Sequence, residues 1–327
     1  MNRTATANLV ARSVAAIAIL ASSCHGGGGD RIGELVESVE GMAWTDGGYS
    51  EGQWEPDWDD AAFYGPAYYS QVGWEEGRAD YQARAVEAVE RNLALAEAGL
   101  SGPSDVFVNN LTEILYGVMG VIDYMDASGD GTPMETVDAS LDRANSLATM
   151  MGSYITGFSN YAMDTYGPTV VTAMFAVADL QYAVLLDTPR RADRIETART
   201  LVAAIDANAW NGTFYEIDPT DPERVGELFL YPNVVMMITL GRLYQATGEA
   251  AYLERAEALY PAIEPLRCPD RPGYRSPYSA EAMGAQTDDY TTLSATSYAI
   301  FGFAILAEIT GDEAYREEID TLLGFIA

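Results

Sequence analysis

Two kinds of apolar pattern alternate along the chain, each about as long as one helix. Stretches such as 230–246 and 291–309 are apolar on all sides, which is typical of helices buried in a core. The stretch 251–263 is apolar along one face only, with the spacing of an amphipathic helix. Its apolar positions are Tyr252, Ala256, Leu259, Tyr260 and Ile263. The alternation predicts inner helices, each followed by an outer helix.

An internal repeat supports this interpretation. Residues 247–252, Thr-Gly-Glu-Ala-Ala-Tyr, match residues 310–315, Thr-Gly-Asp-Glu-Ala-Tyr, and residues 77–81 carry the same Gly-x-x-x-Tyr core. Further turns at 126–129 and 187–189 fall in phase, so the period is about 60 residues. In each copy the glycine ends the inner helix, and the acid lies where the dipole of the next helix favours it.

The repeat predicts an all-α fold, an (α/α)5-6 toroid of helical hairpins, as a single domain over 30–327. The expected inner helices begin near Asp60, Asp105, Gly167, Leu228 and Asp289. Short turns join the helices at one end and long loops at the other. A helix over 30–43 belongs either to a sixth hairpin or to the outer layer. Asn-Gly followed by a β-prone run predicts a small β-hairpin insertion over 208–217.

The first residues are predicted to be an export signal. Residues 1–23 carry Arg3 and Arg12, a short apolar run and then small residues, the order of a secretory signal peptide. Cys24 follows, and this junction resembles a bacterial lipoprotein signal. That resemblance implies lipidation of Cys24, a Gly-rich tether over 24–29 and an outer-membrane or periplasm-facing place in the cell envelope. Cleavage without lipidation is the alternative, and membrane contact is expected through the lipid only.

The charged residues limit the possible chemistry. The chain has 49 acidic and 18 basic residues, with a net charge of −31; every basic residue is Arg, and His25 is the one histidine. Lysine Schiff bases, histidine-dependent triads and His-Cys zinc sites are therefore excluded from 30–327. Nucleic acid is not an expected partner, because phosphate would be repelled. Carboxylates, tyrosines, amides and arginines remain for catalysis.

The repeated turn and the run from Trp210 to Tyr215, Trp-Asn-Gly-x-Phe-Tyr, resemble the six-hairpin glycosidase-like superfamily over roughly 58–327. The resemblance implies an (α/α)6 toroid. It leaves the activity open, because glycoside hydrolases, uronate epimerases and polysaccharide lyases share this architecture.

Candidate site residues gather where the long loops leave the helices. Two acid pairs, Asp59–Asp60 and Asp288–Asp289, precede the first and last inner helices and are the predicted catalytic groups. Glycoside hydrolysis needs two carboxyls, about 5–5.5 Å apart for retention and wider for inversion. Helix capping is the ordinary alternative for such acids. The expected saccharide-binding residues are Trp58, Tyr64, Asn109, Trp210, Tyr215, Tyr231, Arg275 and Tyr290.

A possible metal site lies on the opposite end. Asp126, Ser128 and Asp130 match the first positions of a calcium loop, although Val137 stands where a bidentate Glu is needed. A plain Asp/Gly-rich turn is the alternative. No other cofactor is expected.

These patterns predict a glycoside hydrolase-like protein that acts on a neutral saccharide or glycan. Two alternatives stay open. One is a non-catalytic lipoprotein that binds carbohydrate or another ligand, or serves as a scaffold. The other is a polysaccharide lyase or uronate epimerase that uses tyrosine and arginine.

Overall fold

A computed structural model gives the structure of the chain. It describes residues 44–45, 48–49, 60–102, 107, 111–155, 161–222, 224–269, 272–275 and 293–326. Two compact units are distinguished, Met1–Ala144 and Asn145–Ala327. The predicted signal peptide, the tether and the helix over 30–43 lie outside the described residues. The single domain over 30–327 stays a prediction.

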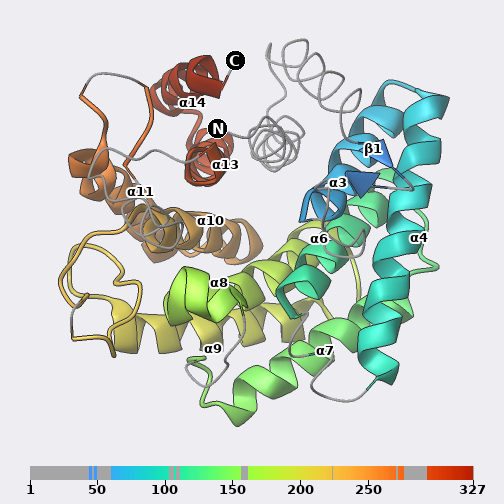
Figure 1. The fold of residues 1–327 in the computed structure, drawn as a ribbon, viewed down its shortest axis with the longest axis horizontal. Helices are drawn as coiled ribbons and strands as arrows, with labels where there is room; N and C mark the ends of the chain where they lie inside the picture. The colour runs from blue at the N-terminus through green and yellow to red at the C-terminus, as the bar shows by residue number, and fades with distance from the viewer. Residues whose placement is uncertain are drawn as a thin grey trace. The chain divides into compact units, whose positions relative to one another are not determined.

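The first unit is built mainly of helices. Two strands of two residues each, β1 (Trp44–Thr45) and β2 (Gly48–Tyr49), pair antiparallel. The helices α3 (Asp60–Glu75), α4 (Ala79–Ser101) and α6 (Leu111–Ser128) follow. In this unit α3 packs against both α4 and α6 (Figure 1).

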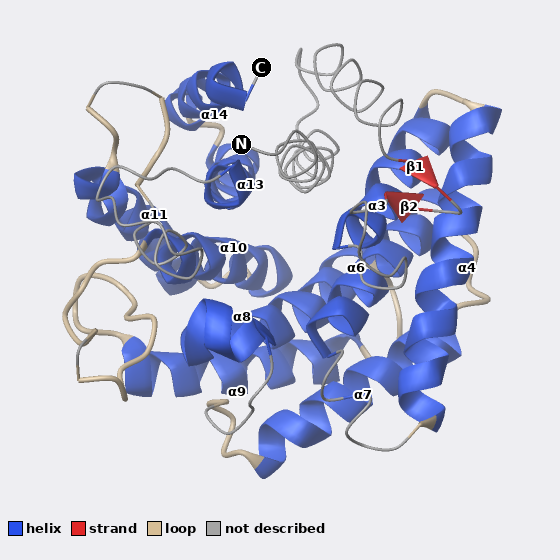
Figure 2. Cartoon of the chain, in the orientation of Figure 1, coloured by secondary structure: helices blue, strands red, loops and turns tan. Residues whose placement is uncertain are grey.

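A helix, α7 (Met134–Met150), leads from the first unit into the second. The second unit contains α8 (Tyr161–Leu185), α9 (Arg191–Ala209), α10 (Leu230–Thr247), α11 (Ala250–Ile263), the 3-10 turn η2 (Glu264–Leu266), α13 (Leu293–Thr310) and α14 (Glu313–Ile326). Here α10 packs between α8 and α13, and α9, α11 and α14 each pack on the helix that precedes them. Figure 2 shows the predominance of helix, which confirms the predicted all-α class.

Burial separates inner from outer helices as the sequence pattern predicted. In α10 every residue from Leu230 to Leu243 is buried, whereas α9 buries one face. The segment Gly167–Leu185 of α8 has the length and apolarity of a membrane span, but 89% of it is buried inside the protein. Its apolar character is therefore that of a core helix.

The repeated turn has the same hydrogen bonds in three copies. Thr247 Oγ1 donates to the carbonyl four residues back at 2.7 Å and accepts the N–H two residues ahead at 3.2 Å. Thr310 makes the same pair at 2.7 and 3.1 Å, and Ser128 at 2.6 and 3.1 Å. The glycine after each has a left-handed φ of 74°, 69° and 72°, respectively. The hydroxyl thus satisfies groups that the end of the inner helix leaves unpaired.

Inner helices approach one another closely at a glycine of α10. A Cβ built on Gly241 would lie 2.5 Å from Ile305 Cγ2 of α13. Since alanine is otherwise the better helix former by about 1 kcal/mol, the glycine is explained by this contact.

We therefore expect Gly241→Ala to lower the free energy of unfolding by about 1–3 kcal/mol, the usual cost of overpacking. Urea unfolding followed by circular dichroism measures the change. Gly131→Ala is the control, because a Cβ there meets nothing within 4 Å. An unfolding midpoint equal to that of the wild type would show that α10 and α13 can separate without cost.

Candidate functional site

The predicted β-hairpin is present as a single antiparallel bridge between Trp210 and Tyr215. Asn233, in the first turn of α10, holds it there. The Asn233 Oδ1 atom accepts the Tyr215 N–H at 2.8 Å, and its Nδ2 donates to the carbonyls of Tyr215 at 3.1 Å and Phe229 at 2.7 Å. Asn233 is fully buried, so its amide satisfies backbone groups that water does not reach.

The same segment is also bound to the preceding inner helix, α8. Gly167 interrupts α8 with φ 74°, and the Thr169 N–H just after it donates to the Ile217 carbonyl at 3.3 Å. Thr169 Oγ1 donates to the Glu216 carbonyl at 2.6 Å and bonds the Tyr154 hydroxyl at 2.8 Å. Because Thr169 has one proton, the Tyr154 hydroxyl is the donor in that bond. The hairpin therefore joins the beginnings of α8 and α10, which we call the long-loop end of the second unit.

The hairpin carries two of the predicted saccharide-binding residues, Trp210 and Tyr215, and both contact outer helices. The Tyr215 hydroxyl donates to Asp206 Oδ1 of α9 at 2.6 Å, and Arg255 of α11 donates to the same oxygen at 2.8 Å. Arg255 lies over the Trp210 ring, 4.9 Å from its centroid. Burial raises the pKa of Tyr215, which is 0% exposed. Tyr215 thus anchors the hairpin and presents no ring face to a ligand, while Trp210 is half-buried.

A pair of tyrosines lies on the inner helices at the long-loop end. Tyr231, in the first turn of α10, is 4% exposed, and its ring lies 5.1 Å from that of Tyr298 in α13. Tyr298 is half-buried. Of the predicted saccharide-binding residues whose side chains are described, Tyr231 is the one that belongs to an inner helix.

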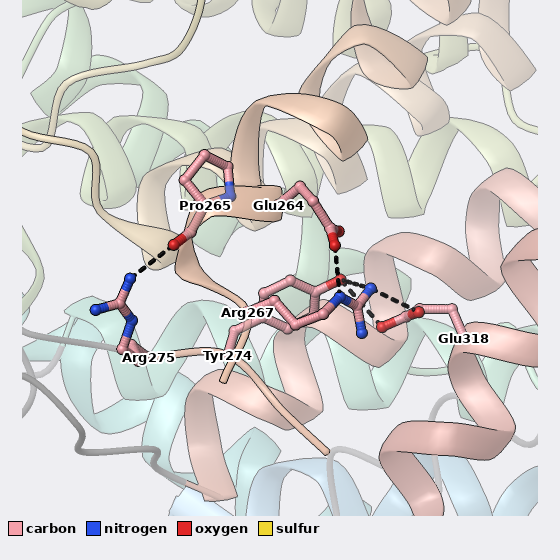
Figure 3. A network of polar contacts seen from close by, with 6 residues as sticks. All are labelled: Glu264, Pro265, Arg267, Tyr274, Arg275 and Glu318. Atoms are coloured by element: carbon pink, nitrogen blue, oxygen red, sulfur yellow. Dashed lines mark hydrogen bonds and ion pairs between the residues drawn. The ribbon is translucent and has the colours of Figure 1, made fainter. Parts of the chain in front are cut away.

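A second polar network ties the loop after α11 to α14 (Figure 3). Arg267 donates to Glu264 and to Glu318, at 2.8 Å in each case. The Tyr274 hydroxyl donates to the other Glu318 oxygen at 3.0 Å, and the Glu318 carboxylate raises the pKa of Arg267. Arg275 donates to the Pro265 carbonyl at 2.7 Å. The charge of Arg267 is therefore balanced by carboxylates of the same fold. One guanidinium nitrogen of Arg275 is bonded to a backbone carbonyl.

The turn that resembles a calcium loop is closed by its own hydrogen bonds. Asp130 Oδ1 accepts the Thr132 N–H at 2.9 Å, which lowers the pKa of Asp130, and Oδ2 accepts the Tyr124 hydroxyl at 3.0 Å. Ser128 serves the repeated turn, and Asp126 is exposed. Among the described residues, no group of three His, Cys, Asp or Glu side chains could hold a metal ion. The calcium site stays a prediction.

Several predicted site residues lie outside the described residues: Trp58, Asp59, Asn109, Asp288, Asp289, Tyr290 and the lipidation residue Cys24. Asp60 begins α3 and Tyr64 lies within it. Whether the two acid pairs meet at one end of the fold therefore stays a prediction.

A buried carboxylate, Glu216, directly follows the Trp-Asn-Gly-x-Phe-Tyr run and was not among the predicted site residues. It is 8% exposed, and its Oε1 accepts the Gly226 N–H at 3.1 Å and the Asn211 amide at 3.4 Å. We call this arrangement the Glu216 clamp, because it joins the two limbs of the loop 211–226. A glutamate among the apolar residues Tyr215 and Ile217 was the available signal.

Comparison with known proteins identifies a shared fold. No family model matches the chain, and no curated protein matches it. Among solved structures, a sugar epimerase from a ruminal bacterium aligns with a TM-score of 0.65 at 13% identity, over 93% of this chain and 88% of that one. The Lin0763 protein from Listeria innocua aligns with a TM-score of 0.57 at 15% identity, over 99% of this chain and 85% of that one.

The chain has the fold of these proteins. Together with the helical hairpins of both units, the likeness confirms the predicted fold class, an all-α fold of helical hairpins of the α/α-toroid type. At these identities the comparison concerns the fold alone, which is one found in a carbohydrate enzyme.

The position of the hairpin depends on the Asn233 amide, and this can be tested. We expect Asn233→Asp to lower the free energy of unfolding by about 2–4 kcal/mol, because a buried carboxylate would face two carbonyls that now accept N–H donors. Urea unfolding measures the loss. Asn208→Asp, in the exposed last turn of α9, is the control and should change stability by about 1 kcal/mol or less, because its side chain is solvated and a charge there meets only the helix dipole. Equal stability of the two variants would contradict the assigned role.

Proposed function

We propose that this chain is an exported, carbohydrate-active protein of glycoside hydrolase type, with its site at the long-loop end of the inner helices. The observation that carries the proposal is the fold shared with a sugar epimerase over 93% of the chain. In folds of this kind the loops supply the chemistry while the helices form the scaffold.

Two carboxyl groups would perform the reaction. The candidates are Asp59, Asp60, Asp288 and Asp289, one acting as acid on the glycosidic oxygen and the other as nucleophile or base. The acid has to keep its proton near neutral pH, which a neighbouring carboxylate favours because two close negative charges repel. The absence of histidine from 30–327 supports carboxylates in these roles. Such a reaction needs no cofactor.

A neutral saccharide is the proposed substrate. Arg267 is neutralised by Glu264 and Glu318, and Arg255 by Asp206, so these arginines do not form a free cationic patch for a polyanion. The net charge of −31 also repels acidic polymers. Tyr298, which is half-buried and lies against the buried Tyr231, is the described aromatic residue that would support a sugar ring, because apolar ring faces stack on aromatic side chains.

Epimerisation is the second candidate, favoured by the fold shared with a sugar epimerase. It would move a proton at a sugar carbon and cleave no glycosidic bond. Without histidine, tyrosine or a carboxylate would carry that proton, with an arginine to steady the substrate.

The two reactions give different products, which makes a saccharide panel decisive. We expect the wild type to release reducing ends from a neutral glycan, and Asp60→Asn and Asp289→Asn to lower kcat by about 100-fold or more, as loss of a general acid or base does. Reducing-end release measures hydrolysis, and chromatography of the unsplit sugar measures epimerisation. Asp187→Asn, in the short turn after α8, is the control that should keep full activity.

An epimer in place of new reducing ends would move the assignment to the second candidate. Saccharide binding measured by calorimetry, with no product formed, would indicate a non-catalytic binding protein. The absence of both binding and turnover would contradict the proposal as a whole.

Export and anchoring are proposed from the segment that ends at Cys24. Metabolic labelling with a fatty acid should mark the wild type and not Cys24→Ser, because the acyl chain is carried by that thiol in lipoproteins. Cys268→Ser is the matched control, since Cys268 is buried and should not affect labelling. Equal label on wild type and Cys24→Ser would contradict the anchor while leaving the saccharide proposal untouched.

A further inference from the structure

The exposed tip of the hairpin contains the one Asn-Gly pair of the sequence, Asn211-Gly212. Asn211, Gly212 and Thr213 are all exposed to solvent. Gly212 has φ 102°, and a Cβ there would meet nothing within 4 Å. Because glycine has no side chain, nothing hinders the approach of the Gly212 backbone nitrogen to the Cγ atom of the preceding Asn211.

The Asn211 carbonyl group is held in a way that favours such an attack. Its Oδ1 accepts the N–H groups of Thr213 and Phe214, each at 3.0 Å. Two donors on one carbonyl oxygen withdraw electron density from the carbon and stabilise the negative charge that develops on the oxygen as a nucleophile adds. The Asn211 Nδ2 atom makes one long contact, 3.4 Å to Glu216 Oε1.

We propose that Asn211 is a site of spontaneous deamidation, and that the change releases the Glu216 clamp. The Gly212 backbone nitrogen loses its proton to water or hydroxide and bonds to Asn211 Cγ. The Cγ–Nδ2 bond breaks, and the nitrogen leaves as ammonia. One water molecule then opens the five-membered imide to an aspartate or isoaspartate. The sum is one amide and one water converted to one carboxyl and one ammonia, with no oxidant or reductant.

The consequence follows from charge. In the native clamp a neutral amide donates to Glu216 Oε1, beside the Gly226 N–H. After deamidation a carboxylate without an N–H faces the Glu216 carboxylate, so one donor is lost and two negative charges meet in a partly buried place. The loop 211–226 should then open more often, while Asn233 still holds Tyr215 on α10.

Arg224, between the two ends of the clamp, offers a readout that is independent of catalytic activity. Val225, which follows it, is 52% exposed, so trypsin can cut there when the loop opens. The tryptic peptide 200–224 also contains Asn208, which is followed by Ala209 in α9 and bonds the Ala204 carbonyl at 2.8 Å. Asn208 is therefore an internal control for deamidation.

The experiment incubates the full chain at mildly alkaline pH, folded and in urea, and follows the peptide 200–224 by mass spectrometry. We expect Asn211 to gain the mass of the amide-to-acid exchange in the folded protein well before Asn208 does. Retention of the Asn211 amide in the folded protein, after the unfolded chain has lost it, would overturn the modification.

The second arm compares the rate of cutting after Arg224. We expect Asn211→Asp, and wild type aged at alkaline pH, to be cut about fivefold faster than fresh wild type, the change that one lost hydrogen bond of roughly 1 kcal/mol gives. Asn211→Ser, which cannot deamidate and adds no charge, should not change on ageing. Cutting of aged protein at the rate of fresh protein would overturn the release of the clamp.

Discussion

The arrangement of the second unit depends on a constraint that comes with full burial of an inner helix. The helix α10 has no exposed residue between Leu230 and Leu243, so its first turn begins inside the protein and its unpaired backbone groups cannot turn to water. Asn233 meets that constraint with one side chain that both donates to and accepts from the backbone around it. The hairpin over 210–217 is thereby placed by the same bonds that complete the helix start. Thr169 does the corresponding work beside the interruption of α8 at Gly167.

Much of the fold could be predicted because it follows from patterns within a few residues. The matching segments at Thr247 and Thr310 mark turns that have the same hydrogen bonds in the structure, and Ser128 has the same role in the turn at 126–129, which falls in phase with them. The inner and outer helices follow from apolar periodicity, which records directly which side is buried. The strands β1 and β2, two residues each, left no such pattern.

The direction of side chains in the hairpin could not be predicted in the same way. An aromatic side chain in a loop can contact either a ligand or a neighbouring helix, and the local sequence does not distinguish the two. The polar partners of Tyr215 lie on two different helices, Asp206 on α9 and Arg255 on α11. Neighbouring side chains along an extended segment point to opposite sides, so the direction of Tyr215 also determines that of Glu216. Since Tyr215 is directed to α9 and α11, the next residue, Glu216, is free to reach back to Gly226 and Asn211 within the loop. The buried carboxylate follows from the tyrosine anchor.

This placement narrows the chemistry available at the long-loop end. The Tyr215 hydroxyl is bonded to Asp206, and Arg255 covers one face of the Trp210 ring. The hairpin therefore contributes more to the rigidity of the fold than to ligand recognition. Under the proposed function, recognition of a saccharide would depend on groups carried by the inner helices, such as Tyr298 beside Tyr231. Residues 30–327 contain neither histidine nor lysine, so the proposed reaction would rely on a carboxyl group that keeps its proton near neutral pH, because burial raises the pKa of a tyrosine such as Tyr154 still further. The same logic explains why a neutral amide closes the Glu216 clamp: on a chain of net charge −31, a second carboxylate at that place would oppose the first.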